Sequence, residues 1–381
     1  MPPNDHSPLK VLIGGGGVAG LEAALALREL AGDRIAATIL APDPEFVYRP
    51  MTVREPFGSA AARRYPLNDI ARDIGADLKK GAFKRLEPDK RLLHTEDGDA
   101  LAYDALLLAM GATPRPHYAH VVTLDDRRLD DQLHGLIQDV EGGYSRKLAF
   151  LVPTEMAWPL PIYELALMTA RRAWDMNEEA VITVVTPEEA PLAVFGREVS
   201  SAVEQLLEDN RVETITSAHA EMPQPGQVEI HPGPRSLSVD RAVALPDLYG
   251  PSAPGVPTTA DRGFVQVDAH CRVLGLDRVY AAGDATDFPV KFGGVAAQQA
   301  DTAAQSIAAF AGALVEPTAF DPEVHAMLLG GDRPLYISAH LTGGHGSNAR
   351  VSETPSWSPA NKIAAKYLAP YLESRDQAGV R

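Results

Sequence analysis

The stretch "LIGGGGVAGLEAALAL", residues 12–27, places four glycines between an apolar run and a segment with helical periodicity. Gly15, Gly17 and Gly20 have the G-x-G-x-x-G spacing of a dinucleotide-binding turn. Gly15 permits the tight turn, Gly17 lets the backbone approach a pyrophosphate, and Gly20 lets the helix pack closely on the strand. The sequence therefore predicts a dinucleotide phosphate site near the start of the chain.

The residues on either side of this turn agree with that prediction. Residues 10–13 are expected to form a short buried strand and residues 18–30 a helix. The amides at the start of such a helix, those of Val18 and Ala19 among them, would point at the phosphates.

The next strand, "RIAATILAP", is expected to end at Ala41 and Pro42, where an acid usually contacts the ribose hydroxyls. Ala41 cannot do this. Either Asp43 or Glu45 reaches the adenosine ribose from the following loop, or backbone groups replace the acid and both carboxylates are simply solvated.

Composition excludes several functions. The formal net charge of −16 over 381 residues argues against a nucleic-acid partner, which would need a basic face. No apolar run is long enough to span a bilayer, and the first residues lack the pattern of a signal peptide, so we expect a cytoplasmic protein. Cys271 is the single cysteine, which excludes an intramolecular disulfide and a thiolate metal cluster; we assign no metal ligands.

Further along the chain, strands are expected at Ala105–Ala109 and after residue 279, the latter followed by a helix from about Gly294. Between them, strands at 147–152 and 180–185 flank a helix at 161–174, a second βαβ pattern. Proline and glycine cluster at 222–234 and 246–257, which indicates loops or a return crossing. We predict an α/β protein with two Rossmann-like dinucleotide-binding domains, namely residues 1–115 with 250–315 and residues 116–249, and a C-terminal region at 316–381.

Three segments, "GGGVAGLEAA", "LLLAMGATPRP" and "VYAAGDATDFPVKFGGVAAQQA", together resemble the flavoproteins with two dinucleotide-binding domains. The resemblance is greatest to the sulfide:quinone oxidoreductases, flavocytochrome c sulfide dehydrogenases and type II NADH dehydrogenases, and it runs from about residue 9 to 372. It implies that the first dinucleotide is FAD. The FAD contacts implied are Gly15, Gly17, Val18, Ala19, Gly20, Ala41, Pro42, Arg49, Ala82, Ala109, Met110, Gly111, Gly283, Asp284, Gly294 and Val295.

Within that set, Asp284 is placed to accept a hydrogen bond from a ribitol hydroxyl. The helix from Gly294 would point its amides at the pyrimidine edge of the flavin, which favours negative charge there. Lys291 either adds its own charge at this edge or is an exposed loop lysine. Arg49 either approaches FAD or substrate or forms a surface salt bridge.

In NADH-using relatives the second domain has its own glycine fingerprint. Here the corresponding place reads "LVPTEMAWPLPIYELAL", residues 151–167, with no glycine and with Trp158 adding bulk, so NAD(P)H binding is not expected. Trp158 and Tyr163 are either core or an aromatic wall over the flavin. Glu164 either assists proton transfer at the flavin or forms a salt bridge on its helix.

Sulfide:quinone oxidoreductases use paired cysteines, which this chain lacks, and Met156 and Trp158 stand where relatives carry a reactive cysteine. Cys271 is expected to be passive. We therefore expect an FAD-dependent oxidoreductase that passes electrons from an unidentified small-molecule donor to an acceptor such as a quinone. Two alternatives remain open: a flavoprotein that works with a protein electron-transfer partner, and an NADH:quinone reductase with an atypical nicotinamide site.

The C-terminal stretch "SWSPANKIAAKYLAPYL", residues 356–372, has aromatic and apolar residues at helical spacing, interrupted by Pro370. It either packs on its own protein or makes peripheral contact with the inner face of a membrane. The nearby "HLTGGHGS", residues 340–347, is expected to be a loop over the flavin. The oligomeric state is left open.

Overall fold

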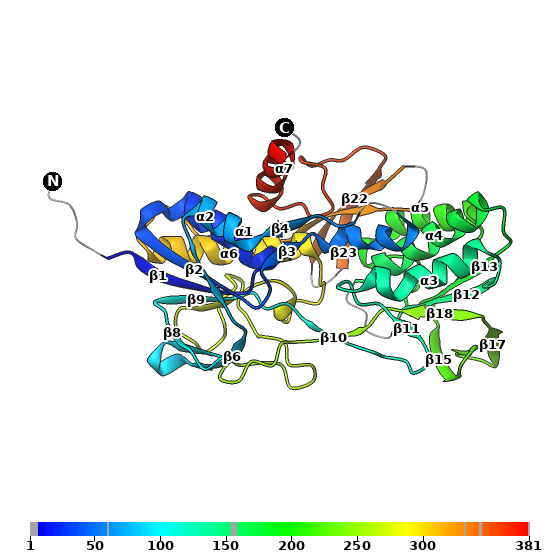
Figure 1. Cartoon of the computed structure of the whole chain (residues 1–381), viewed down its shortest axis with the longest axis horizontal. Helices are drawn as coiled ribbons and strands as arrows, with labels where there is room; N and C mark the ends of the chain where they lie inside the picture. The colour runs from blue at the N-terminus through cyan, green and yellow to red at the C-terminus, as the bar shows by residue number, and fades with distance from the viewer. Residues whose placement is uncertain (1–6, 59–60, 154–157, 331–332, 343–344, 380–381) are drawn as a thin grey trace.

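The computed structural model describes residues 7–58, 61–153, 158–330, 333–342 and 345–379. Two parallel five-stranded sheets lie side by side along the long axis of the molecule, each in its own Rossmann-like domain (Figure 1). The predicted fold class is confirmed by this architecture. The domain boundaries given above stay predictions, although the strands of the two sheets come from residues 9–108 with 279–281 and from residues 122–244.

The first sheet carries the glycine turn. Its strand order is β20-β9-β1-β2-β5, all parallel, so β1 lies at the centre between β2, the next strand in the chain, and β9, a much later one. Ligands of such sheets bind at the carboxyl ends of the strands, where the strand order reverses. The strands are β1 (Leu9–Gly14), β2 (Ile35–Ala41), β5 (Asp77–Lys80), β9 (Ala105–Leu108) and β20 (Val279–Ala281).

Two apolar layers cover the first sheet. On one face α1 packs along α6 through buried alanine and leucine side chains, with α2 beside them. The other face packs against a small antiparallel sheet. These elements are α1 (Val18–Ala31), α2 (Leu67–Ile74), α6 (Gly293–Phe310), β6 (Phe83–Glu87), β7 (Leu92–Thr95) and β8 (Ala100–Ala102); the short pair β3 (Glu45–Val47) and β4 (Arg64–Pro66) and the 3₁₀ helices η1 (Gly32–Arg34), η2 (Arg49–Phe57), η3 (Pro88–Lys90) and η5 (Gly283–Ala285) complete this domain.

The second sheet has the order β11-β18-β12-β13-β14 and is also parallel throughout. Three helices bury leucine, isoleucine and valine side chains on one face, and a three-stranded antiparallel sheet covers the other. The elements are β11 (Val122–Thr123), α3 (Leu129–Glu141), β12 (Lys147–Leu151), α4 (Leu160–Asp175), β13 (Val181–Val185), η4 (Ala193–Phe195), α5 (Arg197–Asp209), β14 (Val212–Ile215), β15 (His219–Gln224), β16 (Gln227–His231), β17 (Arg235–Ser238) and β18 (Arg241–Ala244).

The interpretation of residues 222–234 as loop or crossing is wrong for most of that stretch. Ala220, Met222, Val228 and Ile230 are buried at alternate positions, which is the pattern of strands with one covered face. Proline and glycine only form the turns there. The return crossing lies in the second of the two stretches, 246–257, where β19 (Asp247–Tyr249) pairs antiparallel with β10 (Thr113–Arg115) and the pair joins the two domains.

The C-terminal region is integrated into the molecule. Strands β21 (Glu323–Leu328), β22 (Leu335–Thr342) and β23 (His345–Ser352) form an antiparallel sheet whose buried side chains join the core of the second domain. Residues 340–342 lie on β22 and residues 345–347 lie on β23, so the expectation of a loop is wrong for these described residues; the backbone at Gly346 packs on Phe195.

Helix α7 (Leu368–Gly379) then packs on α1 of the first domain (Figure 1). Leu368 and Leu372 are buried there, and Pro370 lies in the first turn of α7, where proline is tolerated, rather than breaking a longer helix. Among the described helices, none combines the length and the apolar character needed to cross a membrane.

Candidate functional site

The glycine turn is shaped by close backbone contacts. Gly15 has φ +135°, and a Cβ there would lie 2.1 Å from the carbonyl oxygen of Ala109, the residue that follows β9. A Cβ at Gly20 would lie 2.0 Å from the carbonyl oxygen of Gly15. Only glycine fits at these two positions, because real Cβ atoms do not approach backbone so closely.

Gly17 differs from these two glycines because it faces open space. It is the N-cap of α1, and a Cβ there would meet none of the described atoms within 4 Å. The first helical turn begins with Val18 and Ala19 and contains no acidic side chain, and its leading amides have no partner within the helix. This open, amide-lined space fits an anionic phosphate group.

A second helix begins beside the first. Gly283, with φ +78°, would place a Cβ 3.2 Å from the Cβ of Ala19 and 3.3 Å from that of Ala296. The N-terminal turns of α1 and α6 therefore meet at Gly283, which is held by a 2.8 Å hydrogen bond from its amide to Oε1 of Gln299. Ala19 and Ala296, from opposite ends of the first domain's sequence, are thus brought together at one point, as expected.

The turn after β9 and the ends of two further strands border the same carboxyl edge. Gly111 has φ +73°, and a Cβ placed on it would have no described atom within 4 Å, while Met110 is half-buried. The carbonyl of Ala41 at the end of β2 accepts a 3.0 Å hydrogen bond from the amide of Gly81, which directly follows β5 and precedes Ala82.

The two acids considered as ribose ligands are both exposed. Glu45 forms a 3.7 Å ion pair with Arg64, whereas Asp43 stays in the loop after Pro42.

Asp284 follows the Gly283 turn and is half-buried. Burial raises the pKa of its carboxyl, while the positive charge of Lys291 acts in the opposite direction. Lys291 is 7% exposed, so it is not the exposed loop lysine considered above. Its ammonium donates to the carbonyl of Thr286 and lies 3.9 Å from the ring centroid of Phe264, and burial lowers its pKa to about 8.

Arg49 and Asp126 form an ion pair near Asp284. Arg49 begins η2 in the first domain, and Asp126 lies between β11 and α3 in the second; their side chains pair at 3.7 Å. Their opposite charges both act on the carboxyl of Asp284. Asp126 was not predicted as a site residue because nothing in its local sequence marks it: the domain arrangement brings it here.

Glu164 lies in the first turns of α4 and is fully buried. Its carboxylate oxygens lie 2.6 and 2.7 Å from Nζ of Lys362, and one of them accepts a 2.9 Å hydrogen bond from the Leu329 amide. Burial raises the pKa of Glu164, and Lys362 acts against that shift. The structure thus places Glu164 in a salt bridge, with a partner that sequence reasoning missed; its role in proton transfer stays a prediction.

This ion pair lies close to the start of α6. Lys362 also donates to the carbonyl of Pro50, at 3.1 Å, and the next residue, Ile363, would touch a Cβ placed on Gly293 at 3.0 Å. A Cβ on Gly294 would lie 2.9 Å from the Phe292 ring, and Val295 is buried. The first turn of α6 therefore has the Glu164–Lys362 pair as a near neighbour.

In the second domain, aromatic side chains occupy the region at the start of α4. The Trp158 ring stacks on Phe292 at 4.3 Å and meets the edge of Phe195 at 5.4 Å. Trp158 and Tyr163 both belong to the buried core. Met156 lies outside the described residues.

Glu188, the acid that follows β13 in the second domain, already has hydrogen-bond partners within the protein. Glu188 comes after β13, where a Rossmann domain offers a carboxylate to a ribose. Here Glu188 accepts hydrogen bonds from the hydroxyls of Tyr163, at 2.6 Å, and Thr186, at 3.0 Å. Glu188 was missed in the sequence, although its distance past a predicted strand was a usable signal.

The single cysteine lies beside the end of β20, where its carbonyl accepts a 3.0 Å hydrogen bond from the Ala281 amide. Cys271 is buried, and burial raises the pKa of its thiol to about 12. A thiol with such a pKa is a poor nucleophile near neutral pH.

Comparison with known proteins gives consistent results. A model of the family described as pyridine nucleotide-disulphide oxidoreductase matches residues 6–138 and 164–306. The NADH dehydrogenase-like protein Rv1812c of Mycobacterium tuberculosis is 29% identical over 296 residues, which cover 72% of each chain.

Among solved structures, the sulfide:quinone oxidoreductase of Aquifex aeolicus superposes with a TM-score of 0.80 at 16% identity, covering 97% of this chain and 90% of that one. The ferredoxin reductase for the CYP199A2 system of Rhodopseudomonas palustris gives a TM-score of 0.67 at 19% identity, covering 87% and 82%. At these identities the structural likeness concerns the fold.

Proposed function

Because the chain belongs to the pyridine nucleotide-disulphide oxidoreductase family, we propose that it is an FAD-dependent oxidoreductase that passes electrons from a small-molecule donor other than NAD(P)H to a quinone-type acceptor. The observation that carries this proposal is the meeting of the α1 and α6 N-termini at Gly283, beside the open space at Gly17. Proteins of this family typically bind FAD, and the geometry of this turn fits a dinucleotide.

In this proposal the glycine turn and the first amides of α1 hold the pyrophosphate. Asp284 accepts hydrogen bonds from ribitol hydroxyls, and Lys291 with the α6 N-terminus supplies positive potential. FAD, when bound, supplies the two-electron redox chemistry. The residues of the chain position it and hold the protons that accompany the electrons.

The Glu164–Lys362 pair is the proposed proton-handling group. Both side chains are shielded from solvent, and the pair lies near the start of α6. Because burial raises the pKa of Glu164, its carboxylate takes up a proton more readily than an exposed one when the local charge changes. A quinone needs two protons on reduction, so a buried carboxylate–ammonium pair next to the redox site suits this acceptor.

The second domain supports a donor other than NAD(P)H. A dinucleotide there would need close backbone approach at the start of α4 and a carboxylate for its ribose. At the start of α4, where the backbone would approach the dinucleotide, the Trp158 ring stacks on Phe292. The carboxylate available for the ribose, Glu188, already accepts a hydrogen bond from Tyr163. The C-terminal sheet adds to this: a Cβ on Gly330 would lie 2.4 Å from the Cβ of Leu167, so that segment packs tightly on α4.

The acceptor half of the reaction can be tested without knowing the donor. The flavoprotein is reduced anaerobically with dithionite and mixed with a water-soluble quinone, and the return of the flavin absorption is followed. We expect a rate that saturates with quinone concentration, is at least tenfold lower in Glu164→Gln, and is unchanged in Glu204→Gln, an exposed glutamate on α5. Reoxidation no faster than that of free reduced FAD would contradict the proposal.

A second candidate, an NADH:quinone reductase with an atypical nicotinamide site, is favoured by the name of the 29% identical relative. Anaerobic mixing of the oxidised protein with NADH and NADPH separates the two. Our proposal expects no flavin reduction on the time scale of turnover. Rapid reduction by either nucleotide would favour the second candidate and would overturn the assignment of Trp158 and Tyr163 as residues that close the second dinucleotide site.

A further inference from the structure

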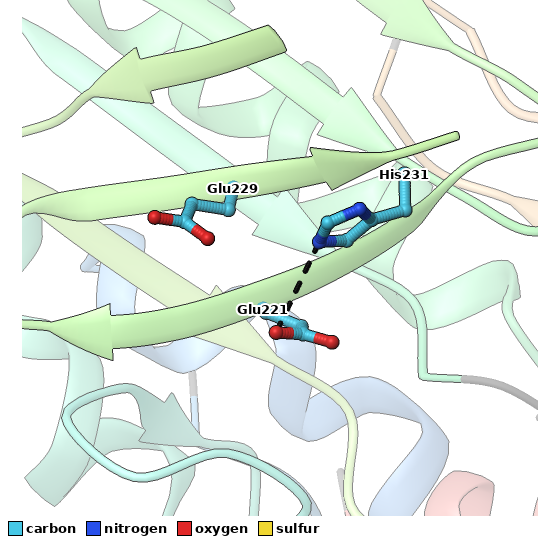
Figure 2. Close-up of side chains that lie close together, drawn as sticks. All are labelled: Glu221, Glu229 and His231. Carbon is cyan, nitrogen blue, oxygen red and sulfur yellow. Dashed lines mark ion pairs between the residues drawn. The ribbon is translucent and has the colours of Figure 1, made fainter. Parts of the chain in front are cut away.

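One group of metal-ligand side chains lies far from the glycine turn. It stands on the outer antiparallel sheet of the second domain, at the opposite end of the molecule from β1 (Figure 1). Strands β15 and β16 of that sheet carry Glu221, Glu229 and His231, and Figure 2 shows their side chains turned toward one another on the same face.

The register of the two strands explains this arrangement. Glu221 lies directly opposite Glu229, and His231 follows two residues later on the same strand as Glu229, so all three side chains share a face. Ala220, which precedes Glu221, and Ile230, which lies between Glu229 and His231, are buried in the core of the second domain, so the three metal-ligand side chains point outward. One ligand atom from each residue lies within 4.8 Å of the others.

The three groups form an N,O,O donor set. Imidazole nitrogen with two carboxylate oxygens is a set that zinc and neighbouring divalent metals accept, with water completing the coordination. We propose that Glu221, Glu229 and His231 form a binding site for a zinc-class divalent metal that ties β15 to β16.

A second physical feature agrees with a cation at this place. Carboxylates directly opposite each other on an antiparallel pair repel and destabilise the ladder. The His231 Nε2 lies 3.9 Å from the Glu221 carboxylate, which is beyond hydrogen-bond distance (Figure 2). A divalent ion drawn between the three ligand atoms would replace that repulsion with attraction to both carboxylates.

Isothermal titration of the untagged protein with Zn²⁺, and with Co²⁺ followed by its visible d–d absorption, tests the proposal. We expect one metal per chain, with binding weakened at least tenfold in His231→Gln and in the double variant Glu221→Gln/Glu229→Gln. His134→Gln, which changes a half-exposed histidine on α3 of the same domain, is the matched control and should bind as the wild type does. Circular dichroism of each variant checks the fold.

Zinc should also raise the thermal midpoint of the wild type and of His134→Gln, but not that of His231→Gln. Failure of the wild type to bind either metal would overturn the proposal. Equal binding by the wild type, His231→Gln and the double variant would also overturn it, because the metal would then lie elsewhere. Neither result would bear on the proposed flavin chemistry, which uses other residues.

Discussion

The ammonium of Lys362 lies 2.6 Å from a carboxylate oxygen of Glu164, although the two residues are 198 positions apart and their side chains are only 5% and 0% exposed. The pair ties the C-terminal segment to the second domain. Removing one partner leaves the other as an unpaired buried charge, which typically costs about 3–5 kcal/mol.

We therefore expect Lys362→Met to lower the free energy of unfolding by about 3–5 kcal/mol in urea denaturation. Replacing both partners, Glu164→Leu/Lys362→Met, should restore most of that loss, because no unpaired charge remains. Arg28→Gln, which breaks an exposed pair with Asp33, should cost no more than about 1 kcal/mol. A double variant less stable than the single one would contradict this account of the pair.

The glycine turn separates a structural role from a binding role. Gly15→Ala should destabilise the protein, because its Cβ would clash with the carbonyl of Ala109 at a positive φ. Gly17→Ala should lower the unfolding free energy of the apoprotein by no more than about 1 kcal/mol, the difference between glycine and alanine at an N-cap with an ordinary backbone conformation, yet reduce FAD retention by filling the phosphate space.

Gly135→Ala is the control, a helical glycine with open surroundings in α3; it should leave FAD content unchanged and stabilise by up to about 1 kcal/mol. FAD content is measured by extraction and the stability by urea denaturation. Normal FAD content in Gly17→Ala would contradict the proposal that the FAD pyrophosphate binds at this turn.

Lys291 should raise the two-electron midpoint potential of bound FAD. Its pKa of about 8 leaves it mostly protonated at pH 7, and its charge favours the added electrons. Lys291→Met should lower the potential by roughly 20–40 mV, or about 1–2 kcal/mol. The difference should shrink above pH 8, where the wild-type amine loses its proton. Spectroelectrochemistry measures the midpoint potential, and Lys84→Met, which changes an exposed lysine, is the control. Equal potentials in Lys291→Met and the wild type would exclude an effect of the Lys291 charge on the flavin.

Asp301 on α6 and Glu22 on α1 are neighbouring carboxylates at the contact of the two helices. Burial and the adjacent Glu22 raise the pKa of Asp301 to about 8. Because this pKa lies above that of the unfolded chain, the proton stabilises the folded state at low pH and that stability is lost as pH rises through about 8.

Asp301→Asn should therefore gain a few degrees in thermal midpoint over wild type at pH 8.5 and much less at pH 5. Exposed Asp131→Asn should show no such trend. An advantage of Asp301→Asn that is equal at both pH values would show that the carboxyl does not titrate in this range.

The features that could be predicted from the sequence are those that depend on residues close together in the chain. The glycine turn, the helices after it and the Gly283-Asp284 loop could be predicted because each depends on backbone requirements of neighbouring residues, such as the positive φ of Gly15. The resemblance noted from three short segments is confirmed by the family match. The FAD contacts assigned to those segments stay predictions.

The rest depended on tertiary packing. Lys362 and Asp126 reach the site from distant parts of the chain, so their local sequences carry no sign of it. The hairpins at residues 219–238 were missed because the prolines and glycines there were interpreted as loop. The apolar residues at alternate positions, such as Val228 and Ile230, are the stronger signal for a strand, and both are buried in the structure. Lys291 and Glu164 each had two interpretations in the sequence, and only the packing showed that both are buried.

The central claim, that this chain holds FAD at the glycine turn, is tested most directly by the cofactor content of the purified protein. FAD is extracted by denaturation and quantified against the chain. We predict a yellow protein with one FAD per chain, released as intact FAD. A colourless protein that fails to take up added FAD while fully folded would contradict the account.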